Sequence, residues 1–91
     1  MKIIGSPQFL KKLKKLPKQD RLVIDEQVRL LSENPTLGEE KIQDLKGVYV
    51  HKFKLNRQQT LLSYQWDESN LYLLTFGSHE NYYRDLKKYL G

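Results

Sequence analysis

The spacing of apolar residues changes near the middle of the chain, and this change limits the folds that the chain can adopt. Up to Glu33 the apolar residues recur three or four positions apart, as on one face of a helix. After Gly47 apolar and polar residues alternate, as in half-buried strands. Asn34 and Pro35 lie between the two regions, and such a pair favours the end of a helix. We therefore expect helices in the first part of the chain and a sheet in the second.

The first part is expected to hold a short strand and two helices. Lys2–Ile4 is an apolar start that suits an edge or central strand. Ser6 can cap a helix whose first residue is Pro7 and which extends to Leu16. Pro17 breaks this helix, and a second helix is predicted over Gln19–Glu33.

The second part is expected to hold three strands and a last helix. After a loop over Thr36–Gly47, the predicted elements are strands at Val48–Lys54, Thr60–Trp66 and Leu71–Phe76, and a helix at His79–Leu90. The polar turns are Asn56–Gln59 and Asp67–Asn70. The Leu71 strand is mostly apolar and hence expected inside the sheet. The order β-α-α-β-β-β-α predicts an α+β fold, with the two early helices packed on one face of an antiparallel sheet. Its 91 residues suit one domain, 1–91.

The composition excludes several classes of protein. Cysteine is absent, which excludes disulfides, thiolate catalysis and cysteine metal sites, and two histidines alone could not close a structural zinc site. We expect no metal and no cofactor. No apolar run approaches the roughly 18 residues of a membrane span, and the start of the chain is too short and polar for a secretory signal. With a net charge of +5, the expectation is a cytoplasmic protein with an anionic partner.

The positive charge is concentrated in two blocks. The first is a run of lysines over residues 11–18, expected on a solvated helix face. The second comprises Lys52, Lys54 and Arg57, with no acidic residue near them in the sequence. Lys52 and Lys54 would share one strand face about 7 Å apart, while His51 and Phe53 share the other. Such a block can bind a nucleic-acid backbone, or its lysines can simply prevent aggregation at a sheet edge.

Histidine and tyrosine are the remaining acid–base candidates. His79 is expected at the start of the last helix, where the helix dipole favours the neutral ring; a capping or surface histidine is the alternative. Tyr83 follows four residues later on the same helix face and could stack on a base. Tyr82 fits the apolar stripe of that helix better, although it and Arg84 are further candidates for RNA contacts. Trp66 is interpreted as packing.

Two segments resemble the RelE/ParE superfamily of toxins from bacterial type II toxin–antitoxin systems, which share the size, charge and element order expected here. The stretch from Lys52 to Tyr64, Lys-Phe-Lys-Leu-Asn-Arg-Gln-Gln-Thr-Leu-Leu-Ser-Tyr, looks like the RelE pattern of alternating lysines, a polar turn and a strand ending in tyrosine. Gly77-Ser78-His79-Glu80-Asn81-Tyr82-Tyr83 is similar to the histidine-containing end of YafQ-type relatives.

The resemblance implies a toxin that cuts messenger RNA in the ribosomal A site without a metal, and that a cognate antitoxin neutralises. Lys52 and Lys54 would then hold the phosphate, His79 would act as acid or base, and Tyr83 would orient a nucleotide. Arg57 and, more weakly, His51 would contact RNA. RelE has arginines where this chain has Leu61 and His79, so the histidine-using branch fits better. The ParE branch, whose members inhibit DNA gyrase, is the alternative.

Overall fold

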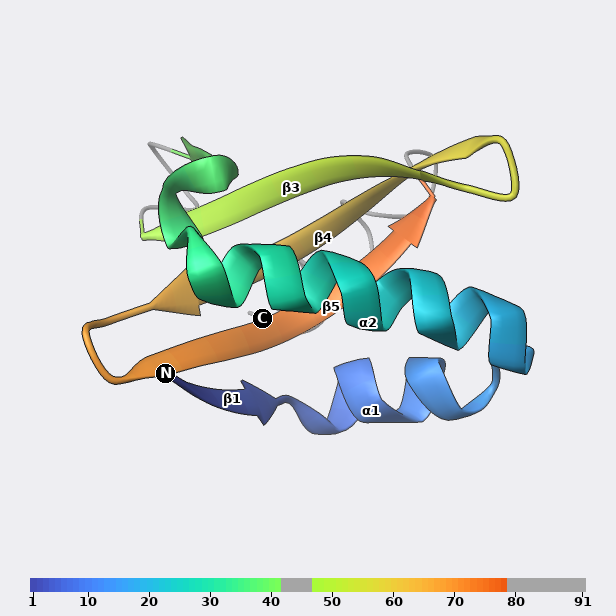
Figure 1. The fold of residues 1–91 in the computed structure, drawn as a ribbon, viewed down its shortest axis with the longest axis horizontal. Helices are drawn as coiled ribbons and strands as arrows, with labels where there is room; N and C mark the ends of the chain where they lie inside the picture. Colours follow the sequence, from blue (N-terminus) through green and yellow to red (C-terminus); the bar gives the residue numbers. More distant parts are fainter. Residues whose placement is uncertain (42–46, 79–91) are drawn as a thin grey trace.

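The computed structural model describes residues 1–41 and 47–78, which form two helices and a mixed five-stranded sheet (Figure 1). The elements are β1 Lys2–Gly5, α1 Pro7–Lys14, α2 Lys18–Glu33, a 3-10 turn at Pro35–Leu37, β2 Glu39–Lys41, β3 Val48–Leu55, β4 Gln58–Trp66 and β5 Asn70–Ser78. The strand order is β1-β5-β4-β3-β2, in which β1 runs parallel to β5 and all other neighbours are antiparallel. Both helices lie on one face of the sheet, which confirms the expected α+β fold.

The first helix begins where the sequence predicts. The Ser6 hydroxyl accepts a hydrogen bond from the Phe9 amide at 3.0 Å and donates one to the Leu74 carbonyl at 2.5 Å. This cap therefore satisfies a free amide of α1 and also fastens the helix to β5. Pro7 occupies the first turn, where a missing N–H costs nothing.

The core lies between the helices and the sheet. Phe9 of α1 packs edge-on against Phe76 of β5, with ring centroids 5.1 Å apart. The buried members of this cluster are Phe9, Ile24, Val28, Leu31, Leu62, Tyr64, Leu71, Leu73 and Phe76. Trp66 is partly buried against the same cluster, which confirms that it packs. The predicted Leu71 strand lies between β1 and β4, as its apolar composition indicates.

The loop expected over Thr36–Gly47 is wrong in part. The chain forms the 3-10 turn and then the short strand β2, which pairs with the beginning of β3. Its sequence, Glu-Glu-Lys, has no strand pattern, and its conformation comes from the pairing with β3.

The turn between β3 and β4 is shorter than the four residues predicted. Leu55 pairs with Gln58, so Asn56 and Arg57 form the whole turn, both with positive φ (53° and 67°). This backbone matches a type I′ turn, whose twist suits a two-residue hairpin. Asn56 Nδ2 donates to Asp20 Oδ2 at 3.0 Å, which holds the hairpin tip against the start of α2.

Neither helix within residues 1–41 and 47–78 combines the length and apolar character that a membrane crossing requires. The helix expected at His79–Leu90 lies outside the described residues.

Candidate nucleic-acid interface

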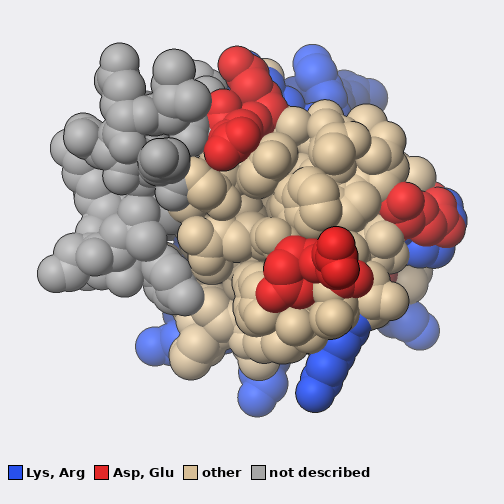
Figure 2. Space-filling model, turned by 90° about the vertical axis from the view of Figure 1, so that its left-hand side faces the viewer, with Lys and Arg blue, Asp and Glu red and all other residues tan. Residues whose placement is uncertain are grey.

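Charge is unevenly distributed over the described surface. Figure 2 shows the end of the molecule that carries the β4–β5 turn and the N-terminus, where separate acidic groups lie in a largely uncharged surface and lysine and arginine lie at its margins. The β3–β4 hairpin turn, with Arg57, lies at the other end of the molecule (Figure 1). A polyanion would therefore approach the hairpin end more readily than the acidic end.

Lys52 and Lys54 lie on an open edge of the sheet. Strand β2 pairs with Val48–Val50 only, so in the described part of the chain the rest of β3 has β4 as its one neighbour. Both lysines are exposed and share one face of β3, as the alternation predicts. Arg57 extends this basic edge into the hairpin turn, where it is also exposed. We call Lys52, Lys54 and Arg57 the basic edge.

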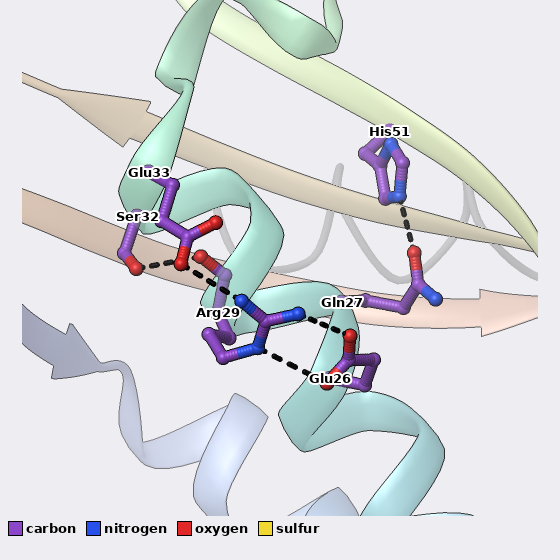
Figure 3. A network of polar contacts seen from close by, with 6 residues as sticks. All are labelled: Glu26, Gln27, Arg29, Ser32, Glu33 and His51. Carbon is purple, nitrogen blue, oxygen red and sulfur yellow. Dashed lines mark hydrogen bonds and ion pairs between the residues drawn. The ribbon is translucent and has the colours of Figure 1, made fainter.

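The basic edge has no carboxylate partner among the described residues, whereas the exposed Arg29 has two. Arg29 of α2 is held by Glu26 and Glu33, at 2.5 and 2.8 Å (Figure 3). The hydrogen bond and charge of Glu26 raise the pKa of Arg29. Within residues 1–41 and 47–78 the three side chains of the basic edge make no such ion pair. Their mutual repulsion is relieved by an anionic ligand, whereas the charge of Arg29 is already neutralised.

His51 lies on the opposite face of β3 from Lys52 and Lys54, and its ring points toward α2 (Figure 3). Its Nε2 lies 2.6 Å from Gln27 Oε1, so the ring donates a hydrogen bond there. The ring also stacks on Phe53, 5.7 Å between centroids. Burial lowers the pKa of His51 below its ordinary value of 6.5. The strand therefore separates a neutral, packed histidine from the lysines beside it in sequence.

Lys12 differs from the solvated lysine face expected for the first block. Its Nζ donates to the Phe76 carbonyl at 2.7 Å and lies 5.9 Å from the centroid of the Phe76 ring. The expectation is wrong for this residue because α1 packs against the end of β5. Its position three residues after the buried Phe9 places it beside the apolar stripe, and that spacing is the signal in the sequence.

The remaining candidates, His79, Tyr82, Tyr83 and Arg84, lie outside the described residues. The sheet register nevertheless shows where the last described residues of β5 lie relative to Lys52. Lys52 pairs with Leu61, and Leu61 pairs with Gly77 of β5. Gly77 is therefore two strands from Lys52, about 10 Å across the sheet. No group of three or more histidine, aspartate or glutamate side chains that could hold a metal occurs within the described ranges.

Comparisons with known proteins agree on the family and the fold. The model of the ParE-like toxin of type II bacterial toxin-antitoxin systems matches residues 3–87. A chain of the intact E. coli RelBE toxin-antitoxin complex is 20% identical, with a TM-score of 0.67 over 85% of this chain and 94% of that one. The RelBE2 complex of Mycobacterium tuberculosis gives 20% identity and a TM-score of 0.69, over 86% and 96%. YafQ from E. coli is 20% identical, with a TM-score of 0.64 over 89% of this chain and 96% of that one.

A search of the curated proteins finds no match to this chain. At these identities the likeness of the solved structures concerns the fold. The family model spans nearly the whole chain, from β1 to beyond β5. The chain therefore belongs to the ParE-like toxins of type II bacterial toxin–antitoxin systems, within the RelE/ParE superfamily.

Proposed function

We propose that this toxin is a metal-independent endoribonuclease that cuts messenger RNA on the ribosome, acts in the cytoplasm and is neutralised by a cognate antitoxin. The observation that carries the proposal is the basic edge, where three exposed cations have no carboxylate partner in the described residues. The RelE and YafQ folds among the similar structures support it, and two of those structures are complexes with antitoxins.

The chemistry needs charge rather than a metal. The 2′-hydroxyl of one nucleotide attacks the adjacent phosphorus, the O2′–P bond forms and the P–O5′ bond breaks. A base takes the hydroxyl proton, and an acid protonates the leaving 5′-oxygen. The phosphate gains negative charge in between, and fixed cations stabilise it. In the proposal Lys52 and Lys54 supply those cations, and Arg57 holds a flanking phosphate.

Proton transfer in this proposal falls to His79, with Tyr83 orienting a nucleotide. Both roles come from the resemblance to the histidine-using branch and not from side-chain geometry. His51 is a poorer acid or base because its Nε2 is occupied by Gln27 and its ring lies on the other face of β3. We therefore assign His51 no proton-transfer role.

The test maps the ends of a reporter mRNA after the toxin is added to a translating extract. Wild type should cut, and Lys54→Ala and Lys52→Ala should each cut about 100-fold more slowly, as when one charge-stabilising group is lost. His79→Ala and Tyr83→Phe test the residues outside the described part. Lys14→Ala removes an exposed lysine of α1 and should cut as wild type. Cleavage that all four site variants retain, or no cleavage by wild type, contradicts the proposal.

Gyrase inhibition is the second candidate, because the matching family model describes ParE-like toxins. It predicts loss of DNA supercoiling by gyrase in the presence of the purified toxin, with mRNA left intact. A supercoiling assay run on the same preparation as the cleavage assay separates the two functions.

A further inference from the structure

A pocket lies beside the basic edge, at the point where β2 stops covering β3. Its volume is about 300 Å³, at the lower end of the range for small-ligand sites. It is lined by Leu37, Gly38, Glu39, Val50, His51 and Lys52. The lining combines apolar residues, a histidine, one acidic residue and one member of the basic edge.

The register places the carboxylate and the lysine on the same face of the sheet. Glu39 is directly opposite Val50, and Lys52 is the next residue on that face of β3. Such diagonal neighbours are about 7–8 Å apart, and no ion pair joins these two in the described residues. Glu39 and Lys52 are thus near enough to hold two parts of one ligand while remaining unpaired with each other.

The floor of the pocket is held rigidly. Tyr64, fully buried, accepts a hydrogen bond from the Gly38 amide at 2.9 Å and donates one to the Pro35 carbonyl at 2.6 Å. A Cβ on Gly38 would lie 2.9 Å from the Val50 carbonyl oxygen. The chain before Glu39 therefore passes close against β3, and only a glycine permits that approach.

The edge of β3 offers backbone groups to the same space. In a two-residue hairpin closed by Leu55 and Gln58, alternate residues of β3 exchange hydrogen bonds with β4. Lys52 falls between those residues, so its N–H and C=O face the open edge, where no described strand pairs with it. A planar ligand in the pocket can therefore form hydrogen bonds with the N–H and the C=O of Lys52.

We propose that this pocket is a nucleobase subsite that selects a base with an amino group on its Watson–Crick edge. The inference rests on the proposed function, since the basic edge must hold the attached phosphates. A nucleotide fits because it joins a flat ring to an anion: the ring lies in the pocket on the face that Glu39 and Lys52 share, and the phosphate stays on Lys52 and Lys54. The Glu39 carboxylate only accepts hydrogen bonds, so it favours the amino groups of cytosine, adenine and guanine and disfavours the O4 of uracil.

The test measures binding of the full chain to fluorescent single-stranded RNA octamers at low salt, by anisotropy. The octamers are uridine-rich and differ at one central position, in two pairs: cytidine against uridine, and guanosine against inosine. Each pair differs chiefly in an amino group. Wild type should bind the amino-bearing member about five-fold more tightly or better.

Glu39→Gln should reduce that preference to less than two-fold, since a carboxamide can turn to accept or donate. The matched control is Glu40→Gln, which removes the same charge from the neighbouring position; Glu40 pairs with Tyr49 and meets its hydroxyl at 3.4 Å. Any general gain in RNA affinity from the lost charge should be equal in the two variants. Equal base preference in both variants, or none in wild type, overturns the inference.

The two failures are distinguishable. If RNA binding weakens in Lys52→Ala and Lys54→Ala but Glu39→Gln leaves the base preference unchanged, only the subsite is wrong. If those lysine variants bind RNA as wild type does, the basic edge does not hold phosphate, and both the proposed function and the subsite are wrong.

Discussion

Arg57 occupies a backbone conformation that suits glycine better than arginine. Its φ of 67° is left-handed, and the preceding Asn56, at 53°, is a residue that tolerates this region. A type I′ turn favours Asn-Gly, so the arginine is retained at a cost in stability. Such strain often coincides with a functional side chain, and here the side chain belongs to the basic edge.

Arg57→Gly should therefore stabilise the protein and weaken RNA binding together. We expect the free energy of unfolding to rise by about 1 kcal/mol, since the left-handed strain of one L-residue is relieved. Urea denaturation measures the gain, and anisotropy measures the loss of RNA affinity. Arg57→Lys keeps both charge and strain, so it should resemble wild type in both measurements. A destabilised Arg57→Gly would contradict the assignment of strain.

The burial of His51 makes part of the stability of the protein depend on pH. Its pKa is lowered by burial, so the unfolded chain takes up a proton more readily than the folded one. The stability that His51 contributes is therefore present above pH 6.5, the ordinary value, and is lost as the pH falls through the folded pKa.

Gln27→Glu should raise the pKa of His51, because it places a carboxylate where the amide oxygen now lies 2.6 Å from Nε2. We expect an NMR titration of the His51 ring to show a higher pKa in the variant than in wild type. Gln19→Glu, in the first turn of α2, adds the same charge and should leave the titration unchanged. An unaltered His51 titration in Gln27→Glu would show that the contact does not persist in solution.

At the scale of elements, the link between the 3-10 turn, β2 and β3 depends on Gly38. A Cβ at this position would lie 2.5 Å from the Tyr64 hydroxyl oxygen, and the nearby Val50 carbonyl is backbone that cannot move aside. Gly38→Ala should therefore destabilise the protein by about 2 kcal/mol, the cost of overpacking a rigid site. Gly5→Ala is the matched control: its Cβ meets the end of the half-exposed Leu10 side chain at 2.9 Å, which can rotate away. Thermal unfolding of the two variants compares them, and equal losses would contradict this account.

The elements that the sequence predicts best are those whose pattern is local. The cap at Ser6, the apolar stripe of α2 and the alternation of β3 each follow from neighbouring residues. Strand β2 could not be predicted in this way, because Glu39–Lys41 acquires its conformation only from the pairing with β3. The pocket depends on where that pairing stops, so it could not be predicted either. The basic edge was predictable because Lys52 and Lys54 are close in sequence as well as in space.

At the scale of the whole molecule, the lysines of α1 and the basic edge lie on different sides of the fold. The lysines of α1 accompany β1 and β5, whereas the basic edge borders β3, beyond β4 (Figure 1). A single RNA strand bound along the basic edge therefore contacts Lys52, Lys54 and Arg57 and not the lysines of α1. The net charge of +5 attracts RNA from any side. Only the lysine and arginine side chains that contact phosphates displace counterions from the RNA.

The salt dependence of RNA binding separates these two effects. Each phosphate contact to a single strand contributes about 0.7 to the slope of log affinity against log salt concentration. Lys52→Ala, Lys54→Ala and Arg57→Gly should each lower the slope by about that amount, and Lys14→Ala or Lys15→Ala should leave it unchanged while slightly weakening binding at low salt. All five variants lose one charge, so a response that depends on net charge alone would be the same for all. Equal slopes in the two groups would mean that RNA binds without a preferred face, which contradicts the basic edge as its site.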